Sequence, residues 1–169
     1  MSLEYWLNKE SISGAYLFVT ESNSIEGIRR QPSEEEVKEH ERFITLDTIT
    51  IPELERFVSV YQSDAKLRDK KGMDVRVGSY FPPKGGQHIK KELEYLLNNI
   101  EYKIHHPDPN YCFYTPFESH TAYENLHPFT DCNGRSGRAL WAWHMKKKGL
   151  DMSLGFLHAF YYQALEGSR

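Results

Sequence analysis

The side chains best suited to chemistry lie close together in one short segment, HPFTDCNGRSGR, which spans residues 127 to 138 and is called the signature segment below. Imidazole gains and loses a proton near neutral pH, so His127 can remove a proton from a hydroxyl group as that hydroxyl attacks phosphorus. Asp131 supplies a hard carboxylate oxygen of the kind that Mg²⁺ prefers. The segment therefore contains a candidate general base and a candidate metal ligand.

The second half of the signature segment has the residue types of an anion site. Asn133 and Gly134 suit a tight turn whose backbone N–H groups converge on an anion. Arg135 and Arg138 follow one helical turn apart, near a helix N-terminus that carries partial positive charge, so they can clamp a polyphosphate. Each residue alone is more often a cap, a turn residue or a solvated charge. All of them in this order favour a site for a nucleoside triphosphate with Mg²⁺.

Two helices must hold the signature segment in place. The sequence predicts one helix over 116–126, which ends just before His127. It predicts another over 134–148, with three lysines at its C-terminal end, where the helix dipole favours cations, and Gly149 as its cap. Residues 116–149 are therefore expected to form a pair of core helices joined by the signature segment.

Further helices are predicted from capping signals and apolar periodicity. Ser33 and Glu36 form a capping box, which starts a helix at Ser33. Gly27 can end an N-terminal helix in a left-handed conformation. Apolar residues at helical spacing mark the remaining helices. These comprise 14–27, 51–62 with Pro52 in its first turn, 89–100, and a final helix over 153–167.

One stretch has the sequence pattern of two short paired strands. Residues 68–80, RDKKGMDVRVGSY, contain a charged turn at 70–72 followed by Val75 and Val77 alternating with Arg76. This pattern predicts a small β-hairpin, with an ordinary surface excursion as the alternative. The predicted fold class is thus mostly α, a helical bundle with one small hairpin.

Length, charge and cysteine usage limit the function classes. The chain has 169 residues, 39% of them hydrophobic, so we expect a single domain over 1–169. A formal net charge of −3 disfavours nucleic acid as a partner. Two cysteines outside any paired motif suggest a reducing, cytoplasmic setting. The longest N-terminal apolar run, residues 15–19, is too short for a membrane span, and no histidine spacing indicates zinc.

HPFTDCNGRSGR resembles the signature of the Fic domain family, H-P-F-x-[D/E]-G-N-G-R-x-x-R. The resemblance extends from about Asp47 to the end of the signature segment and beyond, and it implies a Fic-like helical bundle. The family transfers AMP, and less often another phosphate-containing moiety, from a nucleotide to a protein hydroxyl. The resemblance also assigns roles within the segment. His127 would deprotonate the target side chain, Asp131 would hold Mg²⁺, Asn133 and Gly134 would cradle the α-phosphate, and Arg135 and Arg138 would bind the distal phosphates.

The resemblance gives residues 68–80 a role as well. In the family, a hairpin flap at this place receives the target chain as an added strand and so aligns its hydroxyl with the α-phosphate. Val75, Arg76 and Val77 are the corresponding docking residues here. The expected partner is therefore a target protein that docks on the flap, and a homodimer is also compatible with the sequence.

Cys132 departs from the family pattern, which has glycine at this position. A side chain where the backbone needs a positive φ costs about 1–3 kcal/mol or shifts the loop. We therefore expect a weakened site before an inactive one. The thiol also lies near a helix N-terminus and two arginines, which predicts a lowered pKa and raises a redox or nucleophilic role as the weaker alternative.

A second motif lies near the N-terminus, in SNSIEG. Glu26 falls in the last turn of a predicted helix, where a carboxylate faces the negative end of the dipole and needs a cation unless it is solvated at a frayed end. The string resembles the inhibitory motif [S/T]-x-x-x-E-[G/N] of many Fic proteins, with Ser22 and Glu26 in the specified positions. By that resemblance, Glu26 would pair with Arg138 and occupy the space of the γ-phosphate, within one chain or across a dimer.

Together these features predict a Mg²⁺-dependent protein adenylyltransferase that uses ATP and is autoinhibited by Glu26. Two alternatives remain open. The chain could act mainly as a de-AMPylase in which Glu26 positions water. Cys132 could instead mark a degenerate nucleotide-binding or protein-interaction module that performs no chemistry.

Overall fold

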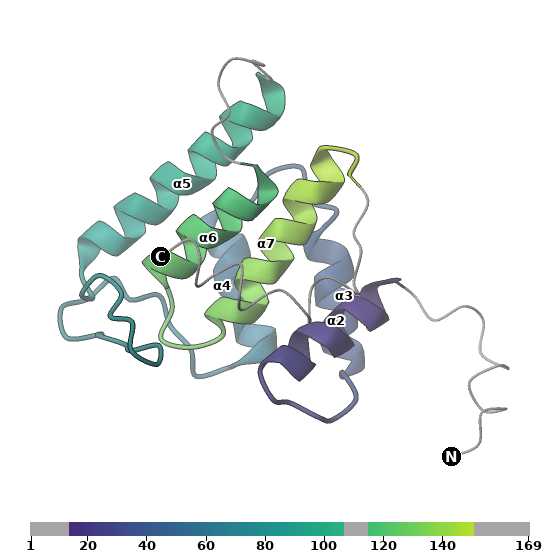
Figure 1. The fold of residues 1–169 in the computed structure, drawn as a ribbon, viewed down its shortest axis with the longest axis horizontal. Coiled ribbons are helices and arrows are strands. Elements are labelled where there is room, and N and C mark those ends of the chain that lie inside the picture. Colours follow the sequence, from purple (N-terminus) through teal and green to yellow (C-terminus); the bar gives the residue numbers. More distant parts are fainter. Residues whose placement is uncertain (1–13, 107–114, 151–169) are drawn as a thin grey trace, which may run out of the picture.

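Six helices make up the part of the chain that the computed structural model describes, residues 14–106 and 115–150. The prediction of a mostly helical fold is confirmed, while the helix expected over 153–167 lies outside the described residues. Helix α7 is surrounded by the other helices, with α6 alongside it (Figure 1). The helices are α2 (Gly14–Ile25), α3 (Glu34–Phe43), α4 (Ile51–Tyr61), α5 (Gln87–His105), α6 (Pro116–Leu126) and α7 (Asn133–Lys147).

Local signals set the helix ends. The amide of Glu36 donates to Ser33 Oγ at 3.2 Å, and the amide of Ser33 donates to Glu36 Oε2 at 2.7 Å, which completes the predicted capping box of α3. Pro52 lies in the first turn of α4, where its missing N–H costs nothing. Gly27 and Gly149 both have positive φ after their helices, as expected of C-terminal caps.

Two apolar clusters of unequal size hold the bundle together. The main cluster contains buried residues from each of the helices α3 through α7, including fully buried Leu54, Ile89 and Trp143. Helix α2 contributes one residue to it, Val19, and otherwise packs through a small separate cluster around Phe18. Most of the buried apolar area of α2 therefore lies outside the main cluster, in the small cluster that Phe18 and Ile25 form with Ala142 of α7.

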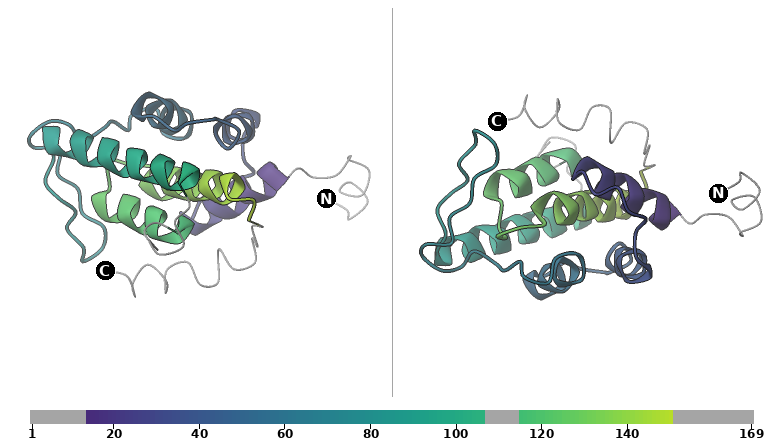
Figure 2. Two further views of the ribbon diagram at one scale, coloured as in Figure 1. Left: turned by 90° about the horizontal axis from the view of Figure 1, so that it is seen from above. Right: turned by 90° about the horizontal axis from the view of Figure 1, so that it is seen from below.

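The predicted β-hairpin at 68–80 is wrong. These residues are described, and they contain only an isolated bridge in which Val77 and Tyr80 exchange hydrogen bonds of 3.0 and 2.8 Å across a tight turn. Side chains bond to backbone groups in and beside this stretch instead: Arg68 Nη1 donates to the carbonyl of Met73 at 3.2 Å, and Asp74 Oδ1 accepts from the amide of Gly85 at 2.8 Å. Residues 69–85 form a loop that projects from one end of the bundle, called the excursion below (Figure 2).

Within the described ranges, no helix combines the length and the apolar character needed to cross a bilayer.

Candidate nucleotide-binding and active site

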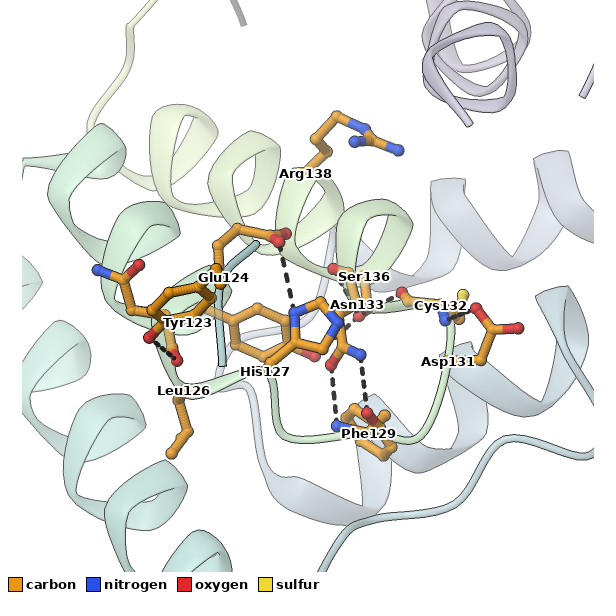
Figure 3. Close-up of polar contacts among 12 residues, drawn as sticks. Tyr123, Glu124, Leu126, His127, Phe129, Asp131, Cys132, Asn133, Ser136 and Arg138 are labelled. Atoms are coloured by element: carbon orange, nitrogen blue, oxygen red, sulfur yellow. Dashed lines mark hydrogen bonds and ion pairs between the residues drawn. The ribbon is translucent and has the colours of Figure 1, made fainter. Parts of the chain in front are cut away.

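His127 lies where α6 ends. Its backbone is left-handed, with φ 49° and ψ 61°, and its amide donates to the carbonyl of Tyr123 at 2.8 Å. The following Pro128 excludes a helical conformation for His127, so the chain must turn there. The imidazole is 15% exposed, at the start of the loop that leads to α7 (Figure 3). The end of α6 and the following proline thus place the candidate base, His127, at the first position of the loop between α6 and α7.

Glu124 lies beside this imidazole, one helical turn earlier on α6. Its Oε2 is 3.9 Å from His127 Nδ1, and its side chain is 5% exposed. Gly137 on α7 makes room for it, because a Cβ there would lie 2.5 Å from Glu124 Oε1. We did not predict a role for Glu124 from the sequence, although its spacing of three residues from His127 was a usable signal.

The side chain of Asn133 closes the loop between the two helices. Its Oδ1 accepts from the amide of Phe129 and its Nδ2 donates to the carbonyl of Phe129, both at 2.8 Å (Figure 3). Phe129 itself is 1% exposed and is packed in the main cluster. The side-chain carboxamide of Asn133 therefore holds the loop in shape. Only the backbone of this residue is left to contact a phosphate.

A second segment braces the loop from the outside. Leu67 and Phe129 form an antiparallel bridge, and the amide of Thr130 donates to the carbonyl of Lys66 at 2.9 Å. The buried guanidinium of Arg68 donates to the carbonyl of His127 at 2.7 Å. Nothing in the local sequence of 66–68 indicated this contact, because its partners are about sixty residues away.

Asp131 lies at the far end of the loop from His127 (Figure 3). The residue is exposed, and one carboxylate oxygen accepts from the amide of Cys132 at 2.5 Å. Among the described residues, no group of three or more His, Cys, Asp or Glu side chains could hold a metal ion. A single carboxylate nevertheless fits Mg²⁺, which proteins commonly hold through one or two carboxylates together with substrate phosphates and water.

Cys132 begins α7 in a left-handed conformation, with φ 66°. This is the positive φ that makes glycine the usual residue at such a turn. The predicted lowering of the thiol pKa is wrong: burial raises the pKa of Cys132 to about 12. The residue is 4% exposed, so removal from water outweighs the neighbouring arginines, and a nucleophilic role loses its basis.

The acidic side chain at the first turn of α7 comes from another part of the chain. No side chain of α7 or its N-cap caps this turn. A Cβ on Gly134 would collide with Glu26 Oε1 and would lie 3.0 Å from Arg138 Nη1. The carboxylate of Glu26, from the end of α2, therefore occupies the space beside Gly134 where the helix terminus favours an anion.

Arg138 holds this carboxylate. Its Nη2 donates to Glu26 Oε1 at 2.6 Å and to the carbonyl of Ser22 at 3.0 Å, while its Nε donates to Ser22 Oγ at 2.9 Å. Arg138 is 1% exposed and Glu26 is 36% exposed. The predicted pairing of Glu26 with Arg138 is thus present within a single chain.

Arg135 has other partners. Its Nη1 donates to the carbonyl of Tyr61 at 3.4 Å, and its guanidinium lies 5.7 Å from the centre of the Tyr61 ring. Its Nε is buried and has no hydrogen-bond acceptor among the described residues, which leaves a donor to satisfy. The two arginines therefore do not form a joint clamp in this arrangement, and each contacts a different helix.

The predicted docking residues lie on the excursion. Val75 and Val77 are half-buried, and Arg76 is exposed, with its guanidinium 5.0 Å from the centre of the Phe81 ring. The excursion is also tied to the end of α6, since the hydroxyl of Tyr80 donates to the carbonyl of Asn125 at 2.8 Å. The surface next to these residues therefore adjoins the end of α6.

The structure thus places His127 at the end of α6 and gathers Ser22, Glu26, Gly134 and Arg138 at the start of α7. Arg135 lies apart from them against Tyr61, and the predicted docking residues lie on the excursion. The loop closed by Asn133 joins α6 to α7, and Asp131 lies on it. No protein-family model matches this chain, and no curated protein matches it.

Proposed function

We propose that this protein transfers AMP from ATP to a hydroxyl side chain of a target protein, and that Glu26 inhibits it at rest. One observation carries the proposal: the carboxylate of Glu26 is held by Arg138 against Gly134, at the first turn of α7. A helix terminus, a buried guanidinium and a glycine that leaves space for an anion are the parts of a phosphate site. The resemblance of the signature segment to the Fic family supplies the nucleotide.

In the proposed reaction, the hydroxyl oxygen of the target forms a bond to the α-phosphorus. The bond from that phosphorus to the bridging oxygen of pyrophosphate breaks, and the hydroxyl proton passes to His127. The contribution of the chain is positioning and charge stabilisation. The left-handed cap at His127 and the loop closed by Asn133 support this role, because they fix the imidazole relative to the start of α7.

Asp131 is the residue that would hold Mg²⁺. The ion, when bound with nucleotide, would neutralise part of the phosphate charge. The exposed position of the carboxylate supports this assignment, since the metal would arrive with the nucleotide.

Autoinhibition follows from competition for one space. A γ-phosphate near Arg138 would have to displace the carboxylate of Glu26, and two anions cannot share the site without repulsion. Helix α2 packs mainly through the small cluster of Phe18, Ile25 and Ala142, apart from the main core, and this supports a helix that can move away from Arg138. Removal of AMP from a target is a second candidate function, which the 36% exposure of Glu26 favours because a water molecule can reach its carboxylate.

The test is transfer of labelled AMP by the full chain. Glu26→Gly should raise incorporation by about 5- to 150-fold, the range of typical coupling free energies. Adding His127→Ala should abolish it. Ser24→Gly is the matched control, because Ser24 is an exposed residue in the same last turn of α2. An absence of labelling by the Glu26→Gly protein would favour a binding module, and Glu26-dependent loss of AMP from a labelled target would favour removal.

A further inference from the structure

Arg68 is fully buried, and its guanidinium donates to four backbone carbonyls. Two belong to the end of α6: Nε donates to His127 at 2.7 Å and Nη2 to Leu126 at 3.0 Å. The other two belong to opposite legs of the excursion: Nη1 donates to Met73 at 3.2 Å and to Pro83 at 2.9 Å. One side chain therefore joins the residue proposed as base to both legs of the loop proposed to receive the acceptor.

The backbone of Arg68 extends the same connection. Its amide donates to the carbonyl of Pro128 at 2.8 Å, and its carbonyl accepts from the amide of Gly86 at 2.9 Å. Arg68 thus contacts the last turn of α6, the loop after it, and the point where the excursion rejoins α5.

Only arginine suits this position. The last carbonyls of α6 have no partner within the helix and lie at its negative end, so they favour a cation. A planar guanidinium presents five N–H donors in a rigid fork and can reach carbonyls on several sides at once. An ammonium group in the same place carries the charge but lacks the fixed fork.

We propose that Arg68 is a positioning residue that sets the distance between the acceptor hydroxyl and His127. The inference rests on the proposed function for its catalytic consequence. The hydrogen bonds of Arg68 described above go to the end of α6, the loop after it and the excursion, so it should act on the alignment of the acceptor and the base, and nucleotide binding should be independent of it.

The first experiment measures kcat for AMP transfer and Kd for ATP in the full chain carrying Glu26→Gly. Adding Arg68→Lys should lower kcat by about 100-fold, as a shift of about 1 Å in a reacting group can do, with Kd for ATP unchanged within about twofold. Arg56→Lys is the control, since Arg56 is 60% exposed and pairs with Glu39 on α3. An unchanged kcat, or a parallel loss of ATP binding, would overturn the proposal.

A second variant reaches the same connection without changing Arg68. A Cβ on Gly85 would lie 2.7 Å from the carbonyl oxygens of Lys70 and Met73, so Gly85→Ala must move that leg of the excursion away from the guanidinium. It should reproduce the loss of kcat with ATP binding retained. If Gly85→Ala transfers AMP normally, the excursion is not aligned through Arg68.

Amide hydrogen exchange separates failure of this inference from failure of the proposed function. Arg68→Lys should speed exchange in both 126–130 and 69–86, and leave the amides of α7 unchanged. If the Glu26→Gly protein transfers no AMP, the proposed function fails and this exchange pattern still decides whether Arg68 aligns the two segments. Faster exchange throughout the chain, or in neither segment, would rule out that role.

Discussion

Glu26 and Arg138 are 112 residues apart in the chain, and their side chains meet at 2.6 Å beside the first turn of α7. Arg138 is almost completely buried, so it needs an anion, and Glu26 at the end of α2 is the anion that the chain itself supplies. Any anionic ligand that binds at this helix terminus must compete with that carboxylate. Binding of an anion beside Gly134 and the position of α2 are therefore linked, because the carboxylate of Glu26 occupies that space.

Ser22→Ala should release part of the inhibition. The substitution removes the hydrogen bond from Arg138 Nε to Ser22 Oγ, while the carbonyl of Ser22 still accepts from Nη2. One such bond contributes about 1 kcal/mol, so AMP transfer should rise by about fivefold, less than for Glu26→Gly. The measurement is the initial rate of label incorporation, with Ser24→Ala as control. A rate at or below that of the unmodified chain would contradict the inhibitory role of this contact.

Glu124→Gln should slow AMP transfer without weakening nucleotide binding. The carboxylate faces His127 Nδ1 and favours the orientation in which the other ring nitrogen accepts the hydroxyl proton. Its loss should lower kcat by about tenfold or more in the Glu26→Gly background, with Kd for ATP unchanged. Glu118→Gln is the control on α6, since glutamine can also serve in its capping box. Equal rates of AMP transfer for the two variants would show that Glu124 does not orient His127.

Cys132 should be inert in the folded protein. Its pKa of about 12 leaves about one thiol in 10⁴ ionised at pH 8, so alkylation by iodoacetamide should be about a thousandfold slower than for an ordinary cysteine. Unfolding in urea should restore normal reactivity. Mass spectrometry of peptides distinguishes Cys132 from Cys112, which lies outside the described residues. Rapid native alkylation at Cys132 would show that the thiol is neither buried nor protonated.

The helix ends that depend on contacts between residues close in sequence were predicted correctly. The capping box of Ser33 and Glu36 and the proline at the start of α4 act through neighbours in the chain, and both ends form as expected. The pairing of Glu26 with Arg138 could be predicted although it is long-range, because the resemblance to a known motif supplied the partner. No periodicity or spacing would have given it.

The errors arose where side-chain contacts or burial overrode the local sequence pattern. The alternation around Val75 and Val77 is compatible with strands, but a ladder does not form, and Arg68 and Asp74 bond to backbone groups in and beside the legs instead. The pKa of Cys132 depends on how deeply the surrounding helices bury it, and charges near it in sequence could not give that depth. Glu124 and Arg68 were missed because their roles arise from packing across the bundle.

Acid should destabilise the fold through its buried histidines. Burial lowers the pKa of His40 to about 4, of His120 to about 3 and of His144 to about 4. In each case the folded-state pKa is below the unfolded value near 6.5, so the stabilisation is fully present above pH 6.5 and is lost as the pH falls from there toward 4. Between pH 7.5 and 5.5, each histidine should lower the free energy of unfolding by about 1 kcal/mol.

Urea unfolding of the full chain at the two pH values measures this loss. His40→Phe should reduce the difference in the free energy of unfolding between the two pH values by about 1 kcal/mol. The new ring should still stack on Phe18, whose ring centre is 4.5 Å from that of His40. His88→Phe is the control for the substitution itself, because it makes the same exchange at an exposed position. An equal pH dependence in the His40→Phe and unmodified proteins would show that His40 is not buried in its neutral form.

AMP transfer restrained by Glu26 is tested most directly with ATP labelled on the α-phosphate and ATP labelled on the γ-phosphate, using the full chain with and without Glu26→Gly. The Glu26→Gly protein should transfer the α label to protein while the γ label stays in solution, and His127→Ala should abolish the transfer. Transfer of the γ label, or no transfer of either label by the Glu26→Gly protein, would contradict the proposed function.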